Sequence, residues 1–406
     1  MVYNALVHII PLIAWSKMNK EFFERGIEEI IEEKSFQEKL KSKKKMKIKM
    51  GFDPTCPDIH LGHAVGLLRL RELQDAGHKI VFLIGDYTTK IGDPSGRNST
   101  RPILSDAEIK ENARTYFEQA GKILDIYKAQ VWYNSEWFSG MHFDDILSLA
   151  GKFTVAQIIE REDFTKRLKS STDIGLHELL YPVMQAYDSV MIESDVEFGG
   201  TDQKFNMLAG RSLQKKMGQK PQDVVTVKIL VGTDGKAKMS KSLGNYIGIT
   251  EEPKSIFGKV MSIKDELIVE YFTLVTKISD AKIENIKKAL KAGENPKKFK
   301  VELAEEIVKL FYNEKMAKSA REEFDNVFVK KELPSDISEV KLSGNYQIIT
   351  LLSLLGAVES NSKARQLIGQ GGIKIDSTKI QDPNAQISTH PGMIIQVGKL
   401  KYYKIK

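Results

Sequence analysis

Apolar positions in the first hundred residues predict the strands of a sheet, with a helix between them. Residues 46–53, MKIKMGFD, alternate apolar and charged side chains and then run apolar, as a strand does. Residues 62–78 have a helical pattern, and residues 79–86 contain five consecutive apolar residues, which is typical of a parallel strand buried on both faces. This order and spacing predict a βαβ unit, and hence a doubly wound, Rossmann-like α/β domain with a parallel sheet.

The same kind of pattern continues further along the chain. Ser105 and Glu108 form a capping box that begins a helix reaching to about residue 124. Residues 130–134 and 224–232 have the composition of strands, and residues 142–187 are mainly helical in pattern.

The pattern changes after residue 250. Residues 250–330 form long polar segments with helical spacing, rich in Lys and Glu, and residues 331–344 are predicted to be a linker. A small α+β unit follows, with helices near 347–356 and 361–369 and then short strands.

The N-terminal region carries two different apolar patterns. Residues 1–15 are apolar, but no Lys or Arg precedes them, no small-residue cleavage site follows, and Pro11 interrupts a run too short to span a bilayer. We expect residues 1–17 to be an extension or a mis-assigned start. After them, an amphipathic helix is predicted from the helical spacing of Phe22, Phe23, Ile27, Ile30 and Ile31.

Composition narrows the protein class and points to a polyanionic partner. The 406 residues contain one cysteine, Cys56, which excludes a disulfide framework and a cysteine-based zinc site and fits a reducing, cytoplasmic setting. The formal net charge is +7. Between Asn361 and Lys406 there are eight Lys or Arg against Asp376 and Asp382, so most of the excess lies in the tail.

Residues 53–63, DPTCPDIHLGH, place two histidines at the start of the helix that follows the first predicted strand. In open α/β sheets, ligands bind beyond the carboxyl ends of the strands, where helix N-termini point. His60 and His63 can donate hydrogen bonds to phosphate oxygens there, and Gly62 leaves room for a nucleotide. The alternatives are a zinc pair, for which no further ligands are near, and two surface histidines.

Residues 232–245, GTDGKAKMSKSLGN, combine glycines and lysines immediately after a predicted strand. A flexible loop carrying Lys236, Lys238 and Lys241 can close over a triphosphate and offset charge on the leaving pyrophosphate. Taken alone, a solvated surface turn explains the loop equally well.

The two motifs together resemble the paired HIGH and KMSKS motifs of class I aminoacyl-tRNA synthetases, in order, spacing and strand context. Further polar residues suit a substrate with a polar end: Asp93 in the turn IGDPSGR, and Tyr181, Gln185 and Asp188 on one face of a predicted helix. The stretch GGTDQ, residues 199–203, adds two glycines, a carboxylate and an amide.

From about Phe22 to Lys406, the chain resembles the tyrosyl-tRNA synthetases. The resemblance implies that His60 and His63 stabilise the ATP phosphates during activation, and that Asp188 reads the phenolic hydroxyl. It implies that the substrate amino group is held by Asp93, Tyr181 and Gln185. It also implies sites for the adenylate or amino acid (Asp53), the ribose (Gly200, Asp202), the substrate carboxylate (Gln203) and phosphates or pyrophosphate (Arg97, Arg101, Lys238, Lys241).

Two positions depart from the better-known form of this family. Eleven residues before His60, where that form has a second hydroxyl-reading tyrosine, the chain has Lys49, and a threonine near the ribose is replaced by Gly66. Both differences resemble those of a second bacterial subgroup. Lys49 and Asp53 share parity on the predicted strand, so Lys49 is expected to be a pocket residue.

The basic tail resembles the RNA-binding module of a small-subunit ribosomal protein. Its residues predicted to bind tRNA are Lys363, Arg365, Gln366, Lys399 and Lys401, which can grip phosphates of a folded RNA by shape. The alternative is a basic but inert solvated domain.

The resemblance implies a two-step reaction: tyrosine and ATP-Mg²⁺ give tyrosyl-adenylate and pyrophosphate, and tyrosine then passes to the 3′ end of tRNA(Tyr). It implies a homodimer with its interface near 130–165, no structural metal and no membrane association. The expected segments are 1–17, a catalytic domain at 18–245, an anticodon-side helical domain at 246–335, and an RNA-binding domain at 343–406. Rival interpretations are a tryptophanyl enzyme, a nucleotidyltransferase with a His-x-Gly-His motif, and a degenerate RNA-binding relative.

Overall fold

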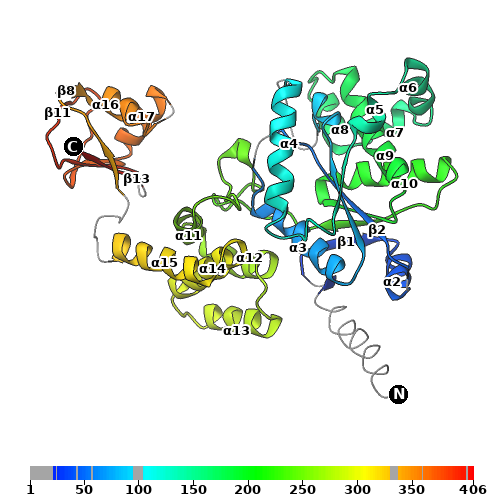
Figure 1. Cartoon of the computed structure of the whole chain (residues 1–406), viewed down its shortest axis with the longest axis horizontal. Coiled ribbons are helices and arrows are strands. Elements are labelled where there is room, and N and C mark those ends of the chain that lie inside the picture. Colours follow the sequence, from blue (N-terminus) through cyan, green and yellow to red (C-terminus); the bar gives the residue numbers. More distant parts are fainter. Residues whose placement is uncertain are drawn as a thin grey trace.

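In a computed structural model, the described part of the protein consists of a six-stranded sheet with its helices, a helical region, and a C-terminal unit that contains a five-stranded and a two-stranded sheet (Figure 1). The structure describes residues 22–23, 25–42, 44–55, 58–94, 104–329, 337–358, 360–398 and 401–406. The expected extension at 1–17 therefore lies outside the described residues, as do Arg97, Arg101 and Lys399.

The larger sheet has six strands in the order β1-β6-β5-β2-β3-β4. All its neighbours are parallel except β1, which pairs antiparallel with β6. The doubly wound α/β prediction is confirmed. The strands are β1 (Ile27–Ile31), β2 (Lys47–Phe52), β3 (Lys79–Ile84), β4 (Gln130–Tyr133), β5 (Val196–Gly200) and β6 (Asp223–Val227).

Helices join these strands. The helices of this part are α2 (Glu33–Lys41), α3 (Leu61–Asp75), α4 (Asp106–Ala120), α5 (Ser135–Phe138), α6 (Phe143–Ala150), α7 (Val155–Ile159), α8 (Glu162–Lys169), α9 (Tyr181–Ile192) and α10 (Lys204–Lys216). Ser105 caps α4 as predicted, through a hydrogen bond from the backbone N–H of Glu108. The strand predicted at 224–232 ends earlier, at Val227.

The predicted N-terminal amphipathic helix is wrong at its isoleucines, which form strand β1. Gly26 has φ +72°, a backbone conformation that interrupts a helix before Ile27. The pairing with β6 shifts register between Ile27 and Glu29. Such an irregularity breaks the two-residue alternation of a strand, so isoleucines at 27, 30 and 31 mimic helical spacing.

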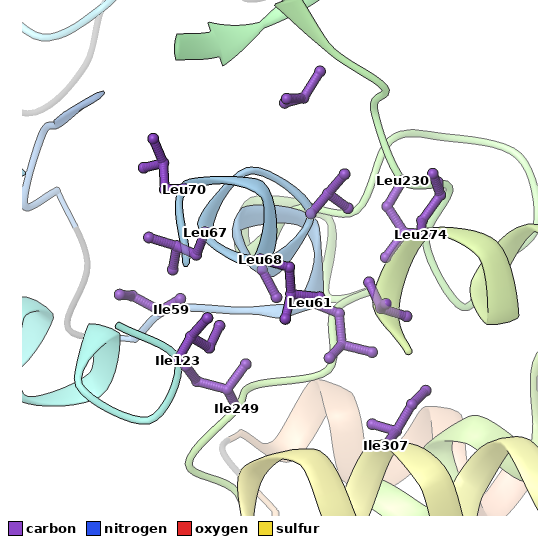
Figure 2. Packing of buried hydrophobic residues seen from close by; sticks show 14 of the residues in the cluster. Ile59, Leu61, Leu67, Leu68, Leu70, Ile123, Leu230, Ile249, Leu274 and Ile307 are labelled. Atoms are coloured by element: carbon purple, nitrogen blue, oxygen red, sulfur yellow. The ribbon is translucent and has the colours of Figure 1, made fainter. Parts of the chain in front are cut away.

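The long polar segments after residue 250 fold as helices, as predicted. They are α11 (Pro253–Met261), α12 (Ile268–Val275), α13 (Asp280–Lys291), α14 (Pro296–Phe311) and α15 (Glu314–Phe324). Their apolar faces share one core with the large sheet. Leu61 and Leu68 of α3 lie in the same cluster as Leu274 of α12 and Ile307 of α14 (Figure 2). Helix α3 is therefore held between the sheet and the helical region.

The C-terminal residues form a separate unit with its own core, including Ile348, Leu352, Ile373 and Ile395. Its five-stranded sheet has the order β10-β9-β12-β13-β7. The elements are β7 (Ser338–Val340), β8 (Asn345–Gln347), α16 (Ile348–Leu354), α17 (Asn361–Gly369), β9 (Ile373–Ile375), β10 (Thr378–Lys379), β11 (Gln386–Ser388), β12 (Ile394–Val397) and β13 (Lys401–Ile405).

The predicted linker at 331–344 is wrong in part, because Ser338–Val340 is strand β7, parallel to β13. Three paired residues are too short a stretch for a hydrophobic period to show. Over the described parts of the chain, each helix is too short or too polar to pass through a lipid bilayer.

Candidate active site

A cleft of about 500 Å³ lies beyond the carboxyl ends of β2, β3 and β5. Parallel strands place their carboxyl ends at one edge, so residues far apart in sequence meet there. The cleft is lined by every described residue that the sequence placed in the nucleotide and amino-acid sites: Lys49, Asp53, His60, Gly62, His63, Asp93, Tyr181, Gln185, Asp188, Gly200, Asp202, Gln203, Lys238 and Lys241.

The two histidines begin helix α3 and cap it with their own rings. The Nδ1 of His60 accepts from the backbone N–H of Gly62 at 3.2 Å, and the Nδ1 of His63 accepts from the backbone N–H of His60 at 3.2 Å. An imidazole nitrogen that accepts a hydrogen bond cannot carry the hydrogen, so the proton of each neutral ring is on Nε2. Both rings line the cleft as neutral hydrogen-bond donors.

Burial keeps this pair neutral. Burial, helped by His63 and by Lys241 and Lys238, lowers the pKa of His60 to about 2. Burial and Lys241 lower the pKa of His63 to about 4. Gly62 is required here, because a Cβ at this position would lie 3.0 Å from the His60 ring.

Both lysines of the KMSKS motif lie against carboxylates. The Nζ of Lys238 is 2.7 Å from Asp202, and the Nζ of Lys241 is 3.0 Å from Asp58. The chain after this loop pairs with the chain before α3: the N–H of Leu61 donates to Ile247, and the N–H of Ile249 donates to Ile59. The histidine motif and the lysine loop are therefore joined by backbone hydrogen bonds.

Asp53 is fixed at the end of β2 by two hydroxyl donors. The Tyr181 hydroxyl donates to its Oδ2 at 2.8 Å, and the Thr88 hydroxyl donates to its Oδ1 at 2.9 Å. Burial and the nearby charge of Asp53 raise the pKa of Tyr181 well above its usual value, so the phenol stays protonated.

Asp93 lies between two donors from different elements. Its Oδ1 accepts from Arg161 at 2.9 Å, and its Oδ2 accepts from the amide of Gln203 at 2.6 Å. Arg161 also pairs with Asp163 at 2.8 Å. Arg161 lies between the short helices α7 and α8, in the segment inserted before α9.

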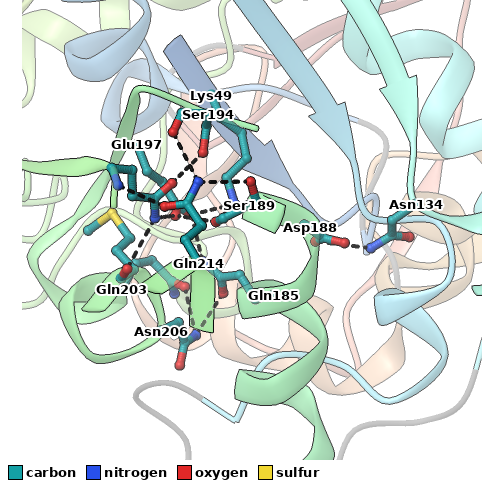
Figure 3. A network of polar contacts seen from close by, with 12 residues as sticks. Lys49, Asn134, Gln185, Asp188, Ser189, Ser194, Glu197, Gln203, Asn206 and Gln214 are labelled. Carbon is teal, nitrogen blue, oxygen red and sulfur yellow. Dashed lines mark hydrogen bonds and ion pairs between the residues drawn. The ribbon is translucent and has the colours of Figure 1, made fainter. Parts of the chain in front are cut away.

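Asp188 is buried on helix α9 at the wall of the cleft. It accepts from the indole Nε1 of Trp137 at 3.0 Å and from Asn134 at 3.4 Å. Burial raises the pKa of Asp188 to about 8, although Lys49 and these two hydrogen bonds act to lower it. Figure 3 shows Asp188 facing Asn134, on one side of a larger polar network.

Lys49 is completely buried and lines the cleft, on the same face of β2 as Asp53. Its Nζ is 2.9 Å from Glu197 and donates to the Ser189 hydroxyl at 2.7 Å (Figure 3). That Lys49 takes part in binding tyrosine stays a prediction.

Several residues of the site were missed by the sequence analysis. They are Asp58, Gly85, Thr88, Asn134, Trp137, Arg161, Ser189, Glu197 and Asn206. One signal was present: Glu197 is a charged residue inside the apolar strand β5. The others carry no local pattern, because their neighbours come from distant parts of the chain.

The residues predicted to bind tRNA lie on the C-terminal unit. Lys363, Arg365 and Gln366 are exposed on helix α17, and Lys401 begins strand β13. Lys401 also donates to the carbonyl of Ala357 at 3.3 Å, just before α17. The structure thus brings the helix residues and Lys401 to one end of the unit.

Among the residues that the structure describes, no group of three or more His, Cys, Asp or Glu is arranged to hold a metal ion. The zinc interpretation of the histidine pair therefore gains no support from the surrounding side chains.

Comparison with known proteins gives concordant matches. The family model for class I tRNA synthetases (W and Y) matches residues 41–329. The tyrosine–tRNA ligase of Thermotoga maritima is 48% identical over 386 residues, covering 95% of this chain and 96% of the relative. That of Dehalococcoides mccartyi is 50% identical over 387 residues, covering 95% and 97%.

Solved structures agree on the fold. The tyrosyl-tRNA synthetase of Archaeoglobus fulgidus, complexed with L-tyrosine, matches with a TM-score of 0.60 and 24% identity, covering 75% of this chain and 99% of that one. A C-terminally truncated mitochondrial tyrosyl-tRNA synthetase of Aspergillus nidulans matches with a TM-score of 0.63 and 19% identity, covering 76% and 93%.

Proposed function

The chain belongs to the class I tyrosine–tRNA ligases, and we propose that it activates L-tyrosine with ATP and transfers it to the 3′ end of tRNA(Tyr). The observation that carries this proposal is the cleft in which the histidine pair, the lysine loop and the buried Asp188 meet. Such a site suits nucleotide phosphates at one end and a polar side chain at the other.

The amino-acid end of the cleft supports tyrosine as the substrate. Asp188 is buried and offers a carboxyl group that can hydrogen-bond a phenolic hydroxyl, whereas an indole gives less reason for a carboxyl group there. The near full-length identity to tyrosine–tRNA ligases does not favour the tryptophan alternative. Asp93, Tyr181 and Gln185 are proposed to hold the substrate ammonium group, and Asp53 and Gln203 to lie beside it and the carboxylate.

In the first step, the tyrosine carboxylate attacks the α-phosphorus of ATP, and pyrophosphate leaves. The Nε2–H groups of His60 and His63 are proposed to donate to phosphate oxygens as charge develops on them. Mg²⁺ is proposed to arrive with the ATP phosphates, as that ion usually does. The ribose is proposed to lie against Gly200 and Asp202.

The lysine loop is proposed to take part in this step. Lys238 and Lys241 lie against Asp202 and Asp58, and they are proposed to turn donors towards phosphate oxygens when ATP binds. Arg97 and Arg101 are proposed to contact the same phosphates or the leaving pyrophosphate.

In the second step, a terminal ribose hydroxyl of the tRNA attacks the mixed anhydride. The basic C-terminal unit is proposed to bind the tRNA through Lys363, Arg365, Lys399 and Lys401. The division at 18–245, 246–335 and 343–406 is proposed to correspond to catalytic, anticodon-side and RNA-binding domains.

A homodimer in the cytoplasm is also proposed. Helices α6 to α8 and the turn before α9 expose the apolar side chains Phe143, Leu147, Val155, Leu168 and Leu176. Large apolar side chains that are exposed together on one surface are typical of an interface. Sedimentation equilibrium of the chain and of Phe143→Asp/Val155→Asp tests this, and a monomeric unaltered chain would contradict it.

Amino-acid-dependent exchange between ATP and pyrophosphate tests the proposed function. Tyrosine is expected to support exchange, and phenylalanine and tryptophan are not. Exchange with tryptophan alone would overturn the assignment of the amino-acid site. No exchange with any amino acid would favour a degenerate RNA-binding relative.

A further inference from the structure

Two opposite charges lie completely buried beneath the amino-acid end of the cleft. Lys49 on β2 is 0% exposed, and Glu197 on β5 is 1% exposed. The two residues are direct partners in the parallel pairing of β2 with β5, and their side chains form an ion pair at 2.9 Å (Figure 3). Removing two such charges from water is costly, and their mutual attraction offsets this cost only with good geometry and further hydrogen bonds.

The Glu197 carboxylate receives four donors. Its Oε1 accepts from Lys49 at 2.9 Å and from the amide of Gln185 at 3.2 Å. Its Oε2 accepts from the Ser189 hydroxyl at 3.0 Å and from the amide of Gln222. Of these four donors, Gln185 is the one whose further hydrogen bonds lead to the other residues of the ammonium site.

An ionised carboxylate only accepts hydrogen bonds, so it determines which end of a neighbouring amide faces it. Gln185 must turn its NH₂ towards Glu197, and its oxygen then faces Asn206, which donates to it at 2.8 Å. The same Nδ2 of Asn206 donates to the oxygen of Gln203 at 3.2 Å. Gln203 in turn donates to Asp93 at 2.6 Å.

These hydrogen bonds link Glu197 to Asp93 through three amides, each with a defined orientation. The oxygen of Gln185 keeps a second lone pair for a cation in the cleft. If Glu197 were neutral, either end of the Gln185 amide could face it. The hydrogen bond from Asn206 would then be the remaining contact of this network that favours the orientation offering oxygen to the substrate ammonium group.

We propose that Glu197 is a positioning residue for recognition of the substrate ammonium group, and that Lys49 balances its buried charge. This inference rests on the proposed function, because it concerns the site for the amino group of the amino acid. Under this inference, Lys49 acts on the substrate indirectly, through Glu197 and Gln185. It does not contact the phenolic hydroxyl.

Glu197→Gln tests the inference, with two competitive inhibitors of tyrosine-dependent pyrophosphate exchange as probes. Tyramine has the phenol and the ammonium group, whereas 3-(4-hydroxyphenyl)propionate has the phenol and the carboxylate but no ammonium group. The KM for tyrosine and the Ki of tyramine are expected to rise about tenfold or more, as for loss of a hydrogen bond to a charged group. The Ki of 3-(4-hydroxyphenyl)propionate and the KM for ATP are expected to stay within about twofold.

The double variant Lys49→Met/Glu197→Gln separates positioning from folding. It leaves no unpaired buried charge, so its melting temperature is expected to stay near that of the unaltered chain, even if either single variant fails to fold. Its KM for tyrosine is expected to stay raised, because a glutamine at position 197 can face Gln185 with either end of its amide and leaves only Asn206 to orient Gln185. Recovery of both melting temperature and tyrosine KM would overturn the inference.

A matched control pair begins two residues before Lys49 on the same strand. Lys47 of β2 pairs with Glu193 at 3.6 Å, but Lys47 is partly exposed, Glu193 is exposed, and both lie outside the cleft. Lys47→Met/Glu193→Gln is expected to change neither KM. If Glu197→Gln raised the Ki of both inhibitors equally, the residue would act on the whole pocket, and the inference would be wrong.

The unaltered chain distinguishes this inference from the proposed function. Absence of tyrosine-dependent exchange in the unaltered chain would refute the proposed function itself. Normal exchange, with a tyrosine KM that Glu197→Gln leaves unchanged, would refute only the role of Glu197.

Discussion

The two histidines at the start of helix α3 both cap the helix and supply hydrogen-bond donors to the cleft. His60 and His63 each use Nδ1 to satisfy a backbone N–H of the first turn, which an uncapped helix leaves without a partner. This use fixes the hydrogen on Nε2, so capping the helix also prepares two neutral donors for the cleft. Protonation of Nδ1 would break the cap, which is a second reason for the rings to resist a positive charge.

The histidine pair should therefore make the fold sensitive to acid. Unfolded histidines bind a proton below about pH 6.5, whereas His63 and His60 stay neutral until about pH 4 and about pH 2. The unfolded state then binds more protons, so stability falls as pH falls from 6.5. Each ring is expected to cost ~2 kcal/mol between pH 7 and pH 5.

Thermal unfolding at pH 7 and pH 5 checks this expectation. The melting temperature of the unaltered chain is expected to fall more than that of His60→Asn/His63→Gln, which has no imidazole at these positions. His78, whose pKa burial also lowers, is present in both proteins and cancels in the comparison. Equal falls in the two proteins would show that the rings are not held neutral.

Gly85 follows β3 and allows Asp53 to reach its partners. A Cβ at Gly85 would lie 2.2 Å from Asp53 and 2.3 Å from the Thr88 hydroxyl. Gly85→Ala is expected to displace Asp53 from Thr88 and Tyr181 and to lower kcat/KM for tyrosine by on the order of 10²-fold, as about 1 Å of misplacement can do. Pyrophosphate exchange measures this. Gly140→Ala, where a Cβ meets nothing within 4 Å, is the control and should leave kcat/KM unchanged.

At the scale of elements, the sequence predicted those whose hydrophobic period is regular. Strands β2 and β3 and helix α3 were found because most residues of each are buried. Strand β1 was misread because its register shift makes three isoleucines look helical. The site residues divide in the same way. Those in sequence motifs were predicted, whereas Asn134 and Trp137 were not, because their hydrogen bonds to Asp188 depend on how separate elements pack.

The entry to strand β1 is an element-scale feature that substitution can test. Gly26 has φ +72°, and a Cβ there would lie 3.2 Å from Val65 of α3. Gly26→Ala is expected to destabilise the fold by about 1–3 kcal/mol through backbone strain and this close contact. Gly293→Ala, with φ +87° and nothing within 4 Å, keeps the strain without the contact. Equal melting temperatures for the two variants would show that packing against Val65 contributes nothing.

The lysine loop is the second element that a substitution can test. Lys241 lies 3.0 Å from Asp58, and it is proposed to meet pyrophosphate oxygens during activation. Lys241→Ala is expected to slow tyrosyl-adenylate formation by on the order of 10²–10³-fold while leaving the Kd for tyrosine nearly unchanged. Single-turnover kinetics and equilibrium binding measure the two quantities. Lys236 is exposed on the same loop but, unlike Lys238 and Lys241, does not line the cleft, so Lys236→Ala is the control. A normal activation rate in Lys241→Ala would refute the proposed clamp.

At the scale of the whole molecule, two independent cores imply that activation and tRNA binding are separable. The core of the C-terminal unit contains only residues from its own elements, whereas the cleft is lined entirely by residues before 245. Changing the surface of one unit should therefore leave the chemistry of the other intact.

Charge reversal on helix α17 tests this separation in the full-length chain. Lys363→Glu/Arg365→Glu is expected to leave tyrosine-dependent pyrophosphate exchange unchanged and to raise the KM for tRNA about tenfold or more, because phosphate contacts dominate affinity. The dependence of the tRNA KM on salt concentration should also become shallower, since fewer counterions are released on binding. Lys34→Glu/Lys41→Glu on α2, at the far end of the molecule from this unit, changes the net charge equally and is the control (Figure 1). If both double variants raised the tRNA KM alike, overall charge rather than a site on α17 would attract the tRNA.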